Sequence, residues 1–163
     1  MLRYIINCLL LLLPPTRLFV IRSFLLRLAG VHLGHNVKFC GHSWIYGRGD
    51  LFIGDNTWIS HNCRIYTHLS SYVRIGANCD IGPHVKIIVG SHVLGSSIRR
   101  AGVEIASPIH IGDGSWIASA SLILDGTFRP PGCVVGAGST VLSRSFQPNS
   151  LIVGSPAFSK ILF

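Results

Sequence analysis

The fold is decided by residues 111–154, which read IGDGSWIASASLILDGTFRPPGCVVGAGSTVLSRSFQPNSLIVG. Aliphatic anchors recur in this stretch at multiples of six residues, namely Ile111, Ile117, Ile123, Val135, Val141 and Val153. The residue after an anchor is repeatedly small, as in Gly112, Ala118, Gly136 and Gly154. A period of six matches neither the 3.6 of a helix nor the simple alternation of a strand. It predicts units of one short strand and one tight corner with the aliphatic side chain inward, which is the sequence sign of a parallel β-helix.

Composition agrees with a repeat protein that forms one domain. Of the 163 residues, 48% are hydrophobic and only 12% are charged, and eighteen glycines occur without a collagen period. The net charge of +8 arises because the chain has only six acidic residues. Such a surface favours anionic partners, for example acidic lipid headgroups or a phosphorylated cofactor. No basic run interleaved with aromatic residues supports binding to nucleic acid.

The cysteines indicate a reducing compartment. There are five, at positions 8, 40, 63, 79 and 133, without any CxxC spacing. Cys63 and Cys79 each follow an anchor by four residues, where the repeat needs a small inward side chain. We interpret them as reduced thiols that serve as small hydrophobes, in preference to a disulfide framework or a zinc site, and we expect no metal.

The N-terminal 29 residues differ from the remainder of the chain. An apolar run at 5–13 is followed by Pro14-Pro15 and then by a leucine-rich run at 18–28, with arginines at 17, 22 and 27. The first run is shorter than the ~20 residues that span a bilayer, and the prolines stop a continuous helix. No small-residue cleavage site follows convincingly. We expect two short helices that lie on a membrane with arginines at the headgroups; the alternative is packing against neighbouring subunits.

The six-residue period begins near residue 30, slips by two residues before Ile53, and slips by four before Ile75. Each slip predicts a bulged corner. The period is lost between Ile87 and Ile111. We expect a loop at about residues 92–108 that projects from one corner of the β-helix. Long loops on a rigid scaffold are usually functional. The repeat domain therefore spans residues 30–157, and residues 158–163 form a short C-terminal extension.

Five segments occur in an order that resembles the hexapeptide-repeat O-acetyltransferases: Gly90-Ser91-His92, residues 99–102, residues 108–117, residues 135–139 and Gly154-Ser155-Pro156-Ala157. This group includes galactoside and maltose acetyltransferases and bacterial polysaccharide acetyltransferases of the capsule, colanic acid or O-antigen type. The resemblance covers residues 30–157. It implies an all-β fold, a left-handed parallel β-helix with three hexapeptides per coil. It also implies a homotrimer, with acetyl-CoA in a groove between adjacent coils and the acceptor entering at the subunit interface.

Acetyl transfer from a thioester to a hydroxyl requires a base for the hydroxyl proton and a donor for the oxyanion. Histidine suits the first role because its free pKa lies near working pH. His92 opens the expected loop, and the resemblance implies that it is the catalytic base. No acyl-enzyme is needed if both substrates meet in one cleft. For the other histidines, at 32, 35, 42, 61, 68, 84 and 110, we expect solvated or stacking roles.

Three residues are candidates for contacts with the acceptor. The resemblance implies that Asn62 touches it; the alternative is an inward amide that satisfies a corner, since asparagine ladders are common in β-solenoids. Arg99 and Arg100 lie in the expected loop, where they could order a lid or bind an anionic acceptor, with a solvated loop tip as the alternative.

The resemblance also implies contacts to acetyl-CoA from Trp116, Ser119, Ala137, Ser143, Arg144 and Lys160. Trp116 would lie along the CoA arm, with an outward aromatic covering a trimer face as the alternative. Arg144, assisted by Lys160, would hold a CoA phosphate. The small residues are needed by the coil in any case.

The sequence departs from the family pattern at three places. Ala118 replaces a glycine, and Phe158 replaces a further basic residue of the phosphate pocket. Arg129-Pro130-Pro131 stands where relatives have an aliphatic residue and glycine, and it predicts one irregular corner.

The leading hypothesis is an acetyl-CoA-dependent O-acetyltransferase that modifies a sugar hydroxyl in polysaccharide or lipid-linked glycan biosynthesis. We expect it in the cytoplasm, peripherally on the inner membrane through residues 1–29. Serine, an amino sugar or a small xenobiotic are alternative acceptors. A non-catalytic β-helix scaffold would bind no acetyl-CoA. A zinc carbonic anhydrase could draw on His61, His84 and His92, but the terminal motifs argue against it.

Overall fold

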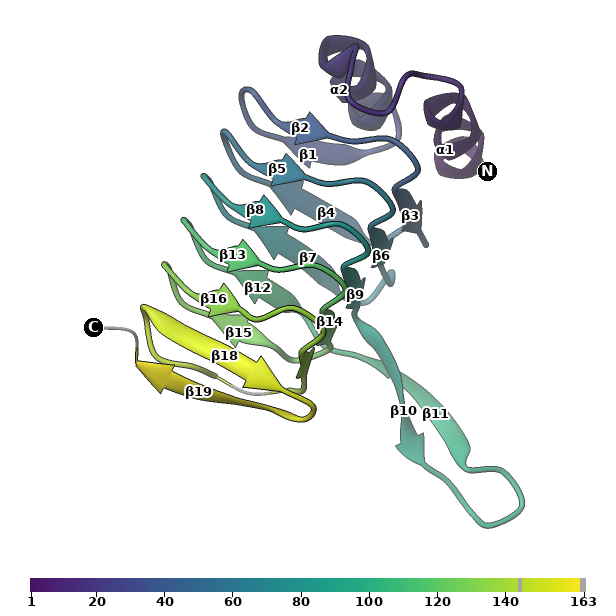
Figure 1. The fold of residues 1–163 in the computed structure, drawn as a ribbon. Coiled ribbons are helices and arrows are strands. Elements are labelled where there is room, and N and C mark those ends of the chain that lie inside the picture. Colours follow the sequence, from purple (N-terminus) through teal and green to yellow (C-terminus); the bar gives the residue numbers. More distant parts are fainter. Residues whose placement is uncertain (144, 162–163) are drawn as a thin grey trace.

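The computed structural model describes residues 1–143 and 145–161, and it is a three-sided parallel β-helix with two helices at its N-terminal end (Figure 1). Face A contains β1 (Val31–Leu33), β4 (Asp50–Ile53), β7 (Tyr72–Ile75), β12 (Ile109–Ile111) and β15 (Phe128–Arg129). Face B contains β2 (Lys38–Phe39), β5 (Trp58–Ile59), β8 (Asp80–Ile81), β13 (Trp116–Ile117), β16 (Val134–Val135), β18 (Ser150–Gly154) and, antiparallel at its edge, β19 (Ala157–Ile161). Face C contains β3 (Trp44–Tyr46), β6 (Arg64–Tyr66), β9 (Lys86–Ile88), β14 (Leu122–Leu124) and β17 (Thr140–Val141).

The anchors predicted from the six-residue period form the core. Ile111, Ile117, Ile123, Val135 and Val141 are completely buried. The prediction fails for Val153, because Ile152 takes the inward position and pairs with Val135. Among the described residues between β17 and β18, none belongs to a strand of face A, and the chain returns to face B one residue earlier than the period requires.

Small polar side chains and thiols occupy the inward positions four residues after the anchors. Cys63, Cys79 and Cys133 are buried there, as are Thr57 and other hydroxyl residues. All five cysteines are free, as predicted. The Cys63 and Cys79 thiols each contact a backbone carbonyl of the next coil, those of Gly82 and Gly112. Burial raises the pKa of Cys63 to about 12, so this thiol stays protonated and inert.

The corners between faces repeat one backbone conformation. At the BC corner, where the chain passes from face B to face C, a residue with positive φ recurs in every coil: His42, Asn62, His84, Ala120 and Gly138. Asparagine and glycine dominate the equivalent column at the AB corner. These residue types adopt the left-handed conformation most readily, which explains their recurrence.

All additional residues enter the coil at the third corner, CA. The two slips of the period fall at residues 47–49 and 67–71. The third and largest insertion is a β-hairpin of β10 (Gly90–Leu94) and β11 (Ala101–Ala106), which projects from the body in Figure 1. The segment expected as an irregular loop is therefore regular over most of its length. It lacks the six-residue period because its strands pair only with each other.

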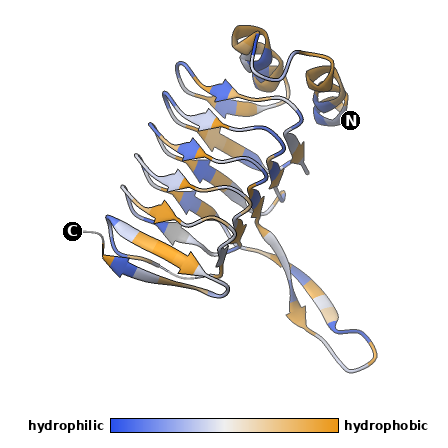
Figure 2. Ribbon diagram, viewed as in Figure 1, coloured by the Kyte–Doolittle hydropathy of each residue, from blue (hydrophilic) through white to orange (hydrophobic). Residues whose placement is uncertain are grey.

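The two helices close the N-terminal end of the core. α1 (Leu2–Leu11) and α2 (Phe19–Leu28) insert Ile6, Leu10 and Leu26 into the continuous hydrophobic cluster. Within the described ranges, no helix has both the length and the apolar character to cross a bilayer. The side of the helices turned away from the core is also rich in apolar residues (Figure 2).

Polar side chains complete this closure. The Asn7 amide donates to the Ile45 carbonyl and accepts from the Ile45 N–H, as a further strand would. The buried Arg22 guanidinium donates to the carbonyl of Leu10 in the last turn of α1 and to the carbonyls of Leu13 and Pro14 in the segment after it.

Arg129 was expected at an irregular corner, and the structure contradicts this. Its side chain is fully buried at an inward position, six residues after Ile123, in register with Ile111. The corner after it keeps the hydrogen bonds of its neighbours, Gly112 N–H to the Arg129 carbonyl and Gly132 N–H to the Asp113 carbonyl. None of the three guanidinium nitrogens has a hydrogen-bond partner among the described residues. The Phe146 ring lies 5.5 Å away, and burial lowers the pKa of Arg129 to about 10.

Replacing Arg129 with methionine should therefore stabilise the protein. Below pH 10 the folded and unfolded chains both carry the arginine charge, so its burial cost is fully present at pH 7 and is relieved only as pH rises through 10. A shift of this size corresponds to about 3 kcal/mol. We expect calorimetry at pH 7 to show a midpoint roughly 6 to 12 °C higher. Arg48→Met, at an exposed arginine, is the control and should change little. A lower midpoint for Arg129→Met would mean that the guanidinium is stabilising.

Candidate functional site

A groove of about 850 Å³ runs along face B and the BC corner, and it collects three of the predicted cofactor contacts, Trp116, Ser119 and Ala137. Trp116 is 55% exposed. Small residues lie beside it, so a long ligand can approach the backbone: Gly82, Ala118 and Gly136 line the groove. The backbone N–H groups of Ser119 and Ala137 make no hydrogen bond within the described part of the chain, although the residues before them do. Two free donors thus stand one coil apart, about 4.8 Å, in one groove.

Sequence reasoning missed several residues of this groove. Trp58 and Trp116 flank Asp80 in register on β5, β8 and β13. The indole N–H of Trp58 donates to the Ser60 hydroxyl at 3.2 Å. The sequence does carry a signal for these residues, because Trp58, Asp80 and Trp116 each immediately precede an inward anchor. To infer from it that the three side chains are neighbours, one must also know which coils are adjacent.

The remaining predicted cofactor contacts lie elsewhere or outside the description. Ser143 is at the CA corner, where its hydroxyl donates to the Gly126 carbonyl at 3.4 Å. Lys160 is exposed on β19, opposite Leu151, which lines the groove. Arg144 lies outside the described residues. The structure therefore groups three of the six residues directly and places Lys160 near the end of the same face.

His92 lies on the exposed hairpin, with its side chain held in one orientation. Its Nδ1 atom is 3.0 Å from the Gly102 carbonyl oxygen on the opposite strand. A carbonyl only accepts, so Nδ1 carries the hydrogen and Nε2 presents a lone pair. This is the tautomer that a general base needs at Nε2.

The base of the hairpin is tied to the preceding coil. Glu104 faces His92 across β10 and β11, and its carboxylate is 3.4 Å from Nε2 of His68 at the neighbouring CA corner. The predicted acceptor residues Arg99 and Arg100 lie at the hairpin tip, and Arg100 donates to the Gly95 carbonyl at 3.4 Å. Arg99 and Arg100 thus project from the CA corner, whereas Asn62 lies at the BC corner, so one chain does not place these predicted acceptor residues together.

Asn62 has φ 60° at the BC corner, a conformation that asparagine tolerates. Its half-buried side chain lines a groove of about 650 Å³ on face C, and so does not take up the inward position of the alternative. Asn62 precedes β6 and His92 follows β9, so the two residues flank face C at opposite edges. One chain does not bring them together.

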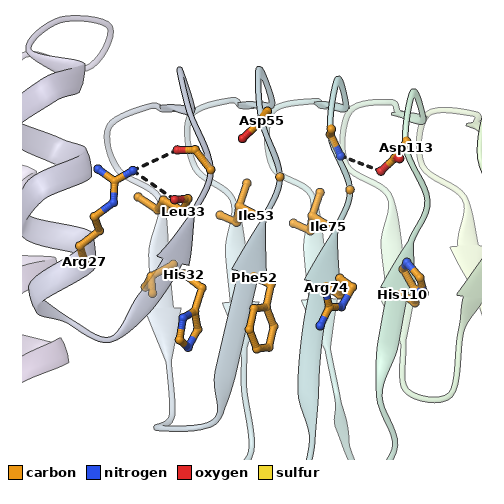
Figure 3. Close-up of a pocket in the computed structure, with 15 residues that line it drawn as sticks. Arg27, His32, Leu33, Phe52, Ile53, Asp55, Arg74, Ile75, His110 and Asp113 are labelled. Carbon is orange, nitrogen blue, oxygen red and sulfur yellow. Dashed lines mark hydrogen bonds between the residues drawn. The ribbon is translucent and has the colours of Figure 1, made fainter.

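Another groove, of about 930 Å³, lies on face A (Figure 3). His32 stacks on Phe52 with ring centres 4.5 Å apart, and the Arg74 guanidinium lies 4.5 Å from the Phe52 ring centre. His110 continues the row, and burial, followed by the charge of Arg74, lowers its pKa. His32 thus has the stacking role that was expected for it. Within the described residues, no three His, Cys, Asp or Glu side chains are placed to share a metal ion.

Comparison with known proteins identifies the class. No family model matches the chain. It is 32% identical over 143 residues to Escherichia coli WcaF, a candidate colanic acid biosynthesis acetyltransferase, with 88% of this chain and 75% of the relative aligned. A candidate acetyltransferase of Schizosaccharomyces pombe is 35% identical over 66% of this chain. The chain spans about half the length of that relative, 51%.

Solved structures agree with this result. A hexapeptide-repeat acetyltransferase of Vibrio cholerae, complexed with acetyl coenzyme A, matches 97% of this chain and 83% of its own with a TM-score of 0.81 and 25% identity. A galactoside acetyltransferase in complex with coenzyme A has the same fold, with a TM-score of 0.71, 23% identity, and coverage of 97% and 77%.

The chain belongs to the hexapeptide-repeat acetyltransferase family. The predicted family and the left-handed parallel β-helix fold are thus confirmed, and the relatives carry the name acetyltransferase, the enzyme class that the sequence predicts for this chain. The predicted donor, acetyl-CoA, is the molecule bound to the Vibrio cholerae relative.

Proposed function

We propose that this protein is an acetyl-CoA-dependent O-acetyltransferase that modifies a sugar hydroxyl of a polysaccharide or lipid-linked glycan. The observation that carries the proposal is the pair of free backbone donors at Ser119 and Ala137 beside the exposed Trp116. The arm of CoA is long and thin and carries amide carbonyls, which need such donors. The acetyl-CoA bound to the Vibrio cholerae relative supports this choice of donor. The likeness to WcaF supports a glycan as acceptor.

His92 is the proposed general base. Its Nε2 lone pair takes the hydroxyl proton as the sugar oxygen attacks the thioester carbon. The tetrahedral intermediate collapses with cleavage of the carbon–sulfur bond, and the imidazolium returns the proton to the leaving CoA thiolate. The hydrogen bond from Nδ1 to the Gly102 carbonyl stabilises the charge that His92 acquires in between.

The substitution His92→Gln should lower kcat by a factor of 10² to 10⁴ and leave the affinity for acetyl-CoA unchanged. Trp116→Ala should show the opposite pattern, with weaker acetyl-CoA binding and a smaller effect on kcat, because it removes ligand contact but not the base. The assay is transfer of labelled acetyl to membrane glycans, with acetyl-CoA affinity from calorimetry. Equal transfer by wild type and His92→Gln would exclude His92 as the base. Absence of both transfer and acetyl-CoA binding in wild type would favour a scaffold.

The active assembly is proposed to be a homotrimer. His92 and Asn62 flank face C at opposite edges in one chain, so a second copy is the simplest way to bring a hairpin to an Asn62 corner. The hairpin also exposes apolar side chains, with Leu94 at 78% and Val103 at 76%, and an isolated hairpin is marginally stable in water.

Light scattering should therefore give three times the 17.7 kDa of the chain. Replacing both Leu94 and Val103 with serine should reduce this mass, since it removes apolar area that the partner would cover. The exposed Leu69→Ser is a matched control outside the hairpin. A monomeric and active wild type would contradict the shared site.

Peripheral membrane contact through α1 and α2 is the remaining part of the proposal. On α2, Val20 is 85% exposed and Phe24 is 60% exposed, so neither side chain contributes to the core. Arg17 is exposed in the turn before α2, where it would meet headgroups.

Flotation with vesicles that contain phosphatidylglycerol tests this contact. Wild type should float with the vesicles, and Val20→Ser combined with Phe24→Ser should reduce the bound fraction severalfold, because it removes buried apolar area. Phe158→Ser, at an exposed phenylalanine on β19 at the other end of the β-helix, should bind like wild type. If wild type stays entirely in the unbound fraction, the membrane proposal is wrong and the helices serve only to close the core.

A further inference from the structure

Two basic side chains stand side by side on face C next to Asn62. Arg64 on β6 and Lys86 on β9 are partners in register, and the inward positions beside them belong to Ile65 and Ile87, so both basic side chains are on the outer surface. Neighbouring strands are about 4.8 Å apart. Like charges placed directly opposite each other destabilise a sheet.

Among the described residues, no acidic side chain forms an ion pair with Arg64 or Lys86. The outward column on face C continues with Trp44 on one side and Leu122 and Thr140 on the other. Arg64 donates to the backbone carbonyls of His42 and Cys63, which carry no net charge. The Lys86 ammonium has no ion pair or hydrogen bond within the described part of the chain.

The pair lines a groove that already has the features of a polar ligand site. The lining of this groove of about 650 Å³ consists of Asn62, Arg64, His84, Lys86, Ala120, Leu122 and Thr140. Amide and hydroxyl groups are available for sugar hydroxyls, and Leu122 and Ala120 offer apolar surface for a ring face. None of the six acidic residues of the chain, at positions 50, 55, 80, 104, 113 and 125, lines it.

We propose that this groove selects acceptor glycans that carry an anionic group, a carboxylate or a phosphate. The inference rests on the proposed function, and it adds the acceptor class. The guanidinium and ammonium groups of Arg64 and Lys86 would form charge-assisted hydrogen bonds with the anionic oxygens. An anionic ligand would supply the opposite charge that the described residues do not place beside Arg64 and Lys86, whereas a neutral sugar would not.

Binding to three matched probes tests the proposal without requiring turnover. The probes are methyl β-glucoside, methyl β-glucuronide, which differs by a carboxylate, and glucose 1-phosphate, which distinguishes a phosphate source. Titration calorimetry on the wild-type assembly should show at least tenfold tighter binding of one anionic probe, and the preference should weaken as salt is added. Arg64→Gln and Lys86→Gln should each reduce the preference, and the double variant should abolish it. Arg48→Gln, at an exposed arginine elsewhere, should retain it.

Acetyl transfer to the same probes separates the possible failures. Equal binding and equal transfer for neutral and anionic probes, unchanged in the double variant, would overturn the anionic-acceptor inference and leave the O-acetyltransferase proposal intact. Anion selectivity that depends on Arg64 and Lys86, without any acetyl-CoA binding, would overturn the proposed function instead. A double variant that loses the trimer but keeps wild-type selectivity would assign the pair to subunit contact, and so also overturn the inference.

Discussion

Each coil of this β-helix satisfies its backbone N–H and C=O groups on the coils above and below it, so the first and last coils have an unpaired side. Exposed strand edges invite pairing with other chains, and the open end of the core would meet water. At the N-terminal end, the Asn7 amide replaces a neighbouring strand for Ile45, and Leu10 and Leu26 cover the core. At the C-terminal end, β18 and β19 fold back as an antiparallel pair. The helices are therefore required for closure, whatever else they bind.

The same stacking limits where the chain can vary. Corners AB and BC hold a column of residues with positive φ, and any insertion there would break hydrogen bonds to two neighbours. Additional residues are found at corner CA, where they grow from the first slip to the hairpin. The two corners therefore contribute different groups to the candidate site. The BC corner, which has no insertions, presents the free backbone donors of Ser119 and Ala137, and the CA corner, which has insertions, carries the side chain of His92.

The sequence was sufficient to predict features that depend on local spacing. The buried anchors from Ile111 to Val141, the free cysteines and the family could all be predicted, because each follows from a six-residue pattern or an ordered set of motifs. Features that depend on which coils are adjacent could not. Trp58 and Trp116 line one groove although the hairpin lies between them in the sequence. Their strands could be aligned from the sequence only if the length of each insertion were known. The prediction of an irregular corner at Arg129 was wrong for another reason. The six-residue pattern marks the position as inward, but a charged side chain without a hydrogen-bond partner is not expected in a core.

The net charge of +8 also overstates the surface available to anionic partners. Arg3 donates to the carbonyls of Ala29, Gly47 and Gly49, Arg22 is buried against the end of α1, and Arg27 donates to the carbonyls of Leu33 and Gly34. Each of these guanidinium groups donates several hydrogen bonds to backbone carbonyls. Their positive charges are therefore used inside the fold and are not free to attract an anionic partner. Arg64 and Lys86 differ because the Lys86 ammonium closes no gap in the backbone, and the two cationic residues are paired in register without an acidic partner among the described residues. A chain with so few acidic residues could neutralise this pair only with a ligand or another subunit, and its position between Asn62 and the hairpin favours the ligand.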